Sequence, residues 1–150
     1  MNNSEANITK VESLHATRTM AFYLLYASDR QDNSVPIEDI ARQFKDGFNL
    51  EYSDSLFELE MAMGVTENSD RLDEIIKPHL KNWNFNRLGC CTKIILRMAI
   101  WELERKDSIH QIVIDEAIEL AKDFAEKDAY KFVNGILDKI HKDKSIKNQE

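Results

Sequence analysis

Apolar residues recur every three or four positions along most of the chain, and this spacing places them on one face of an α-helix. The first such stretch predicts a helix from Val11 to Arg30. Residues 1–10 are polar and lack this spacing, so we expect a flexible N-terminal segment there. The spaced apolar residues of the first helix are Leu14, Ala21, Leu24 and Leu25.

Two shorter helices are predicted next. Residues 34–36 combine a capping serine with a proline suited to a first helical turn, and they predict a helix over residues 36–45. A further apolar face over residues 52–63 predicts a third helix. We expect it to end at Gly64 or within the polar residues 67–69.

The second half of the chain predicts four more helices. The first opens at a capping Ser69, and Pro78 should make its last turn irregular because proline lacks the amide hydrogen. Residues 88–103 are the most apolar segment and predict a long, buried helix, while residues 113–124 and 132–140 each carry an amphipathic period. The pattern therefore predicts an all-α protein with about seven helices.

A chain of 150 residues fits one domain, because a domain of this size buries enough apolar surface to offset the entropy lost on folding. The predicted helices fall within residues 11–141, and we expect the lysine-rich residues 142–150 to form a flexible tail. No apolar run approaches the roughly 20 residues that span a bilayer, and residues 1–15 lack a secretory core, so we expect a cytoplasmic protein with no membrane partner.

The net charge of −7 is distributed unevenly along the chain. Residues 38–74 carry three cations against eleven acids, whereas residues 75–106 carry seven cations and two acids. The second stretch, at +5, can face a polyanion such as a nucleic acid. The same lysines and arginines can equally well solvate exposed helix faces, and the charge pattern alone leaves both interpretations open.

The residues that usually carry catalysis are scattered. The glycines are dispersed and none precedes a lysine–serine pair, which excludes a phosphate-binding loop. Cys90 and Cys91 are neighbours that cannot join distant segments, and no local base would form their thiolates. We therefore expect no enzymatic activity, no metal and no cofactor. The histidines, too isolated for a zinc motif, are His15, His79, His110 and His141.

Glu102, Glu116 and Asn134 have two interpretations each, one functional and one structural. Glu102 and Glu116 lie among apolar residues, where a carboxyl group can serve as a general acid. Arg97 is a ready partner, and a buried arginine–carboxylate pair more often locks helix packing than performs a reaction. Asn134 can contact RNA, or it can tie a helix start to a neighbouring turn.

Five segments of the chain carry a family resemblance: AFYLLY at 21–26, RLDEIIKPHLKNW at 71–83, ILRMAIWEL at 95–103, VIDEAIELAKDF at 113–124 and KFVNGILDKI at 131–140. They resemble the NusB family of transcription antitermination factors. The resemblance covers most of residues 11–141 and implies seven helices in two packed helical bundles. It also implies binding to the boxA RNA of ribosomal RNA operon transcripts together with NusE, a small-subunit ribosomal protein, within the RNA polymerase elongation complex.

The resemblance also implies where RNA and the protein partner bind. Tyr26 and Thr92 are the expected contacts with the ribosomal protein. Single-stranded RNA is held by cations along its backbone and by aromatic faces under its bases. We therefore expect a shared surface in which Lys131 and Phe132 lie near Arg18. The full set of expected RNA contacts is His15, Arg18, Arg97, Lys131, Phe132 and Asn134.

An alternative is a protein-only adaptor that binds NusE and has lost strong RNA binding. Family members often carry several arginines before the first-helix core, whereas SLHATRTMA at 13–21 keeps only His15 and Arg18. Fewer phosphate contacts lower both RNA affinity and its salt dependence. A related fold also occurs as the amino-terminal part of an rRNA cytosine methyltransferase, but that enzyme needs a cofactor domain for which this chain has no room.

Overall fold

The computed structural model describes residues 3–48, 57–81 and 84–147. Within these ranges the chain contains seven α-helices, two short 3-10 helices and no strand, so the predicted all-α class is confirmed. The chain divides into two compact units, residues 1–63 and residues 64–150, and each is described by itself.

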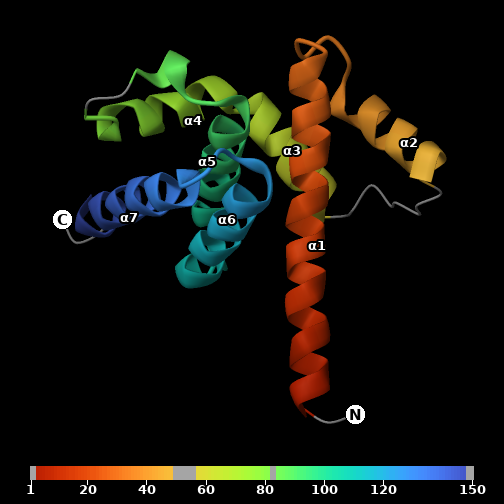
Figure 1. The fold of residues 1–150 in the computed structure, drawn as a ribbon, viewed down its shortest axis with the longest axis horizontal. Helices are drawn as coiled ribbons and strands as arrows, with labels where there is room; N and C mark the ends of the chain where they lie inside the picture. The colour runs from red at the N-terminus through yellow and green to blue at the C-terminus, as the bar shows by residue number, and fades with distance from the viewer. Residues whose placement is uncertain (1–2, 49–56, 82–83, 148–150) are drawn as a thin grey trace. The chain divides into compact units, whose positions relative to one another are not determined.

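The first unit is built on helices α1 (Asn3–Arg30) and α2 (Ile37–Phe48), which pack against each other (Figure 1). Helix α1 begins at Asn3 and not near Val11, because an apolar period marks only the turns that face a core and sets no limit on further turns. The expected flexibility of residues 1–10 stays a prediction. The two helices bury Ala21, Phe22, Leu24, Leu25, Ile37, Ile40 and Ala41.

The turn between α1 and α2 is tied by Asn33. Its backbone amide donates to the Ser28 carbonyl at 2.9 Å, and the Ser28 hydroxyl donates to the Asn33 side chain at 2.9 Å. Asp32 and Asn33 have φ values of 51° and 58°, a left-handed conformation that Asp and Asn adopt more readily than most residues. The turn therefore ends α1 at Arg30, as predicted.

Helix α3 (Phe57–Glu67) spans the boundary between the units and leads into α4 (Ser69–Ile76) of the second unit. In the second unit, α6 packs against both α5 and α7, and α4 packs against α5 (Figure 1). The remaining elements are the 3-10 helices η1 (Lys77–His79) and η2 (Phe85–Arg87) and the helices α5 (Cys90–Leu103), α6 (His110–Phe124) and α7 (Ala129–Lys147).

One predicted helix boundary in this region was wrong, and one open alternative is decided. Of the two predicted ends of α3, Gly64 or residues 67–69, the structure shows the second, because α3 continues to Glu67. The cap position before α4 is held by Asn68 instead of Ser69, and the Asn68 side-chain amide donates to the Gly64 carbonyl at 2.7 Å. The irregular last turn expected at Pro78 is confirmed, because the chain tightens into η1 there.

Helix α5 forms the core of the second unit, as its apolar sequence predicted. Trp101 is only 2% exposed, and Glu102 is also buried at 7%. Helix α7 continues to Lys147, beyond the predicted end at Ile140, and the flexibility of residues 142–150 stays a prediction. The other buried residues of α5 are Thr92, Ile94, Ile95, Leu96, Met98, Ala99 and Ile100.

Candidate nucleic-acid interface

The loop before α7 places the lysine and the aromatic ring of the expected RNA site. Asp128 has a φ of 66°, and its carbonyl accepts from the Lys131 amide at 3.2 Å, which starts the helix. Lys131 is exposed, and its ammonium lies 3.8 Å from the Asp128 carboxylate. Exposed ion pairs contribute little energy, so a phosphate can replace Asp128 as the partner of Lys131.

Phe132 is half-buried and lines a cavity of about 290 Å³, which we name the Phe132 pocket. Thr92, an expected contact with the protein partner, and Phe132, an expected RNA contact, both line this pocket. Thr92 is itself buried, at 6% exposed. The two sides of the pocket are formed by Arg87, Leu88, Gly89 and Thr92, and by Glu126, Lys127, Asp128, Ala129 and Phe132.

Asn134 is exposed on α7, three residues after Lys131, so both side chains lie on one side of the helix. The adjacent Tyr130 was missed by the sequence analysis. Its ring centroid lies 5.1 Å from the Lys122 ammonium and 5.9 Å from the Lys131 ammonium. Tyr130 is visible in the sequence segment AYKF. Its proximity to Lys122 is not, because it arises from the packing of α6 against α7. The start of α7 therefore offers two aromatic rings and exposed cations.

Arg97 forms a two-pronged ion pair with Asp73. Its Nε donates to Asp73 Oδ1 at 2.6 Å and its Nη2 donates to Asp73 Oδ2 at 2.8 Å. The arginine–carboxylate pair expected from the sequence exists, but its carboxylate comes from α4, and not from Glu102 or Glu116. Because two of its donors are already used, Arg97 is better suited to positioning helices than to holding a phosphate directly.

The expected contacts on α1 belong to the first unit. His15 is half-buried, and Arg18 is only 6% exposed. The Arg18 Nη1 donates to the Leu14 carbonyl at 3.0 Å, and its guanidinium lies 5.8 Å from the centre of the Phe57 ring. This conformation does not present Arg18 as a surface cation, so its role in RNA binding, like that of His15, stays a prediction.

Tyr26 is 37% exposed and has the surroundings of an interface anchor. Its ring stacks on Phe22 at a centroid distance of 6.1 Å, and the Arg30 guanidinium lies 5.5 Å from its centre. A tyrosine held in this way can bury a large area with little loss of rotamer freedom. The exposure of Tyr26 is compatible with its expected role as a partner contact.

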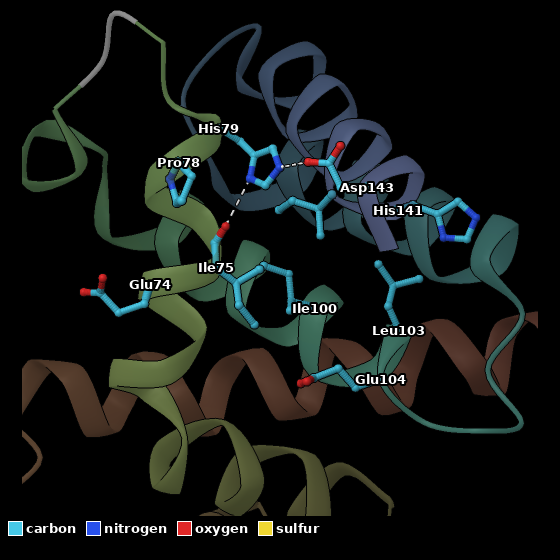
Figure 2. A pocket seen from close by; sticks show the side chains of 10 residues that line it. Glu74, Ile75, Pro78, His79, Ile100, Leu103, Glu104, His141 and Asp143 are labelled. Carbon is cyan, nitrogen blue, oxygen red and sulfur yellow. Dashed lines mark hydrogen bonds and ion pairs between the residues drawn. The ribbon is translucent and has the colours of Figure 1, made fainter. Parts of the chain in front are cut away.

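A larger cavity of about 560 Å³ lies elsewhere in the second unit (Figure 2). Its floor is apolar, and three carboxylates line it, those of Glu74, Glu104 and Asp143. His79 bridges two elements there, with Nδ1 3.1 Å from the Ile75 carbonyl and Nε2 2.5 Å from Asp143. No lysine or arginine is among the described residues that line this cavity, whereas Arg87 and Lys127 line the Phe132 pocket beside Glu126 and Asp128, so this cavity suits a polyanion less well.

The described residues were also compared with the requirements of metal binding, disulfide formation and membrane insertion. Within the described ranges, no group of three or more histidine, cysteine, aspartate or glutamate side chains is placed to hold a metal ion. Cys90 and Cys91 are both unbridged thiols. None of the described helices has the length and hydropathy to cross a membrane.

Sequence and structure comparisons agree on one family. The pattern of the NusB family matches residues 15–142. The transcription antitermination protein NusB of Staphylococcus epidermidis is 38% identical over 126 residues, covering 83% of this chain and 95% of that protein. A T. maritima NusB structure aligns with a TM-score of 0.74 at 32% identity, covering 85% of this chain and 89% of that one.

A second solved structure, of antitermination factors NusB and NusE in complex with dsRNA, aligns with a TM-score of 0.71. Its matched chain is 26% identical, and the alignment covers 85% of this chain and 95% of that one. Taken together, the family pattern and these relatives show that the chain belongs to the NusB family.

Proposed function

We propose that this chain is a transcription antitermination factor that binds boxA RNA of ribosomal RNA operon transcripts together with a NusE-type ribosomal protein. The relatives named above are transcription antitermination proteins, and one structural neighbour is a complex of NusB and NusE with dsRNA. The observation that carries the proposal for this chain is the start of α7, where Phe132 lines a pocket and Lys131 is exposed beside it. An elongating RNA polymerase in the cytoplasm is the assembly in which this binding would act.

The geometry around Phe132 suits an unpaired strand. A base that stacks on an aromatic ring contributes about 1–3 kcal/mol to binding, and a backbone phosphate adds a salt-dependent attraction to a nearby cation. Phe132 supplies the ring, Lys131 the cation and Asn134 an amide that can contact a base edge. These three residues are therefore the strongest candidates among the six expected RNA contacts.

The first test compares boxA RNA with a scrambled sequence in a filter-binding assay. With the ribosomal protein present at moderate salt, wild-type protein should retain boxA RNA preferentially. Phe132→Leu should weaken retention about tenfold, because leucine keeps the apolar volume but offers no ring to stack on. Lys139→Ala, which removes an exposed cation further along α7, is the control and should bind like wild type. Equal retention of both RNAs would refute the proposed specificity.

The protein partner is proposed to contact Tyr26 and Thr92. Tyr26→Ala should weaken binding of the ribosomal protein about tenfold, since aromatic anchors often cost about 1–2 kcal/mol or more when truncated. Tyr26→Phe keeps the ring and should bind nearly as well as wild type. Isothermal titration with the purified ribosomal protein measures both. Equal affinities of wild type and Tyr26→Ala would remove Tyr26 from the proposed interface.

A protein-only adaptor remains the second candidate function, and the burial of Arg18 favours it. With Arg18 at 6% exposed, the first unit offers one phosphate contact fewer than the resemblance implied. This alternative predicts that the ribosomal protein binds with unchanged affinity while boxA RNA is not retained, with or without the partner. The filter-binding comparison above therefore separates the two functions.

A further inference from the structure

Three cations of the second unit surround one aromatic ring, that of Phe85. The ring centroid lies 4.9 Å from the Lys93 ammonium, 5.4 Å from the Lys77 ammonium and 6.0 Å from the Arg97 guanidinium carbon. We name these four residues the Phe85 cluster. The cations come from η1 and α5, so their meeting point is produced by the fold and not by sequence spacing.

Local hydrogen bonds hold Phe85 in place. The Asn84 side chain accepts from the Asn86 amide at 3.0 Å and caps the short helix η2. The Phe85 carbonyl then accepts from the Leu88 amide at 3.1 Å. Phe85 itself is half-buried, which leaves part of the cluster open to a ligand.

The cations of the Phe85 cluster are only partly neutralised. Arg97 is paired with Asp73, and Lys77 donates to Glu74 at 2.9 Å, a hydrogen bond that raises the pKa of Lys77 and keeps it charged. Among the residues that the structure describes, Lys93 has no carboxylate partner. The cluster therefore retains positive charge, to which the nearby chain adds the exposed side chains of Lys81 and Arg87.

The Phe85 cluster continues the Phe132 pocket along the chain. Arg87 lines that pocket and belongs to η2, the same short helix as Phe85. Thr92 also lines the pocket, and it directly precedes Lys93 in α5. A strand held at Phe132 and extending past Arg87 would next meet the cations around Phe85.

We propose that the Phe85 cluster is a second contact for the same single strand of RNA, in which Lys93 and Lys77 hold a backbone phosphate beside the first contact at Phe132. The Phe85 ring keeps the two ammonium groups together, because the negative face of an aromatic ring attracts cations. This inference rests on the proposed RNA-binding function and adds a stretch of the RNA path to it.

The test measures how RNA affinity depends on salt. Fluorescence anisotropy titrations of a labelled boxA RNA, with the ribosomal protein present, are repeated over a range of KCl concentrations. Each phosphate contact with a single strand contributes about 0.7 to the slope of log affinity against log salt. Lys93→Ala should reduce the magnitude of the slope by about this amount. Phe85→Leu should also weaken binding, because it removes the ring and keeps the apolar contact.

Lys106→Ala is the matched control, because it removes the same charge from an exposed lysine in the turn that follows the other end of α5. Its slope should equal that of wild type. Equal slopes for Lys93→Ala and wild type would overturn the second contact, as would equal losses for Lys93→Ala and Lys106→Ala. If RNA does not bind the wild type at all, the proposed function fails first and the second contact falls with it. If Phe132→Leu weakens binding and Lys93→Ala does not, only the second contact is lost.

Discussion

Gly64→Ala is expected to lower the free energy of unfolding by about 3 kcal/mol, because the indole of Trp101 occupies the space of the new methyl group. A β-carbon at Gly64 would lie 2.6 Å from Trp101 Cε2 and 3.0 Å from Cζ2, and closer still to Nε1. Trp101 is 2% exposed, so its rigid ring has little room to move. Alanine otherwise favours a helix over glycine by about 1 kcal/mol, so intrinsic propensity alone predicts the opposite sign.

Urea denaturation followed by circular dichroism measures this loss, and Gly135→Ala provides the control. Gly135 lies in α7, and a β-carbon there would meet no atom within 4 Å. Gly135→Ala should therefore stabilise the protein slightly, by up to about 1 kcal/mol. Trp101→Phe should recover part of the loss when combined with Gly64→Ala, since the smaller ring frees space. A Gly64→Ala protein as stable as wild type would refute the close packing of Gly64 on Trp101.

Asp73→Ala is expected to lower the free energy of unfolding by about 2 kcal/mol. Breaking a fully buried ion pair costs about 3–5 kcal/mol, because the remaining charge loses its partner in a poorly solvated place. The side chains of Arg97 and Asp73 are 20% and 13% exposed, so water compensates part of this cost. The loss should therefore lie below the range for complete burial and well above that of a surface pair.

A double-mutant cycle in urea isolates the interaction. Asp73→Ala combined with Arg97→Ala should be less destabilised than the sum of the two single variants, because no unpaired charge is left. The pair between Arg71 and Glu104 is the comparison, since its side chains are 47% and 20% exposed. Glu104→Ala should cost less than about 1 kcal/mol. Additive losses for Asp73 and Arg97 would show that their contact contributes no coupling.

The helices could be predicted from the sequence because an amphipathic period is a local property. The end of α1 at Arg30 and the tightened turn at Pro78 followed from local patterns and from proline chemistry. The sequence left open whether α3 ends at Gly64 or at residues 67–69, because the contact that requires a glycine there is with Trp101, a residue far along the chain. Local sequence patterns indicate that a glycine ends a helix, and they carry no information about a tertiary contact that would place it inside one.

The same distinction applies to the candidate site. Family resemblance selected Lys131 and Phe132, and in the structure Phe132 lines a pocket together with Thr92, while the adjacent Lys131 is exposed. The charge count located a basic stretch, but it could not show that Lys93 gathers with other cations around Phe85. Such pairings depend on how helices pack and leave no fixed spacing in the sequence.

Two predictions about the first unit are still to be tested by binding experiments. Arg18 was expected to share one RNA surface with Phe132, and its burial against Phe57 makes it a weaker candidate than Lys131. Tyr26 remains a candidate partner contact with an exposed ring. The apolar Trp83 also predicts an anchor for the link before α5, but Trp83 lies outside the described residues.

The central claim is that RNA binds at the start of α7, and photo-cross-linking tests it most directly. A boxA RNA carrying single 4-thiouridine residues is irradiated in complex with the full chain and the ribosomal protein. The protein is then digested with trypsin for mass spectrometry. Cleavage after Lys131 yields residues 132–139, and we predict that this peptide carries a cross-linked nucleotide. Cross-links confined to peptides from other segments, with residues 132–139 unmodified at every thiouridine position, would contradict the account.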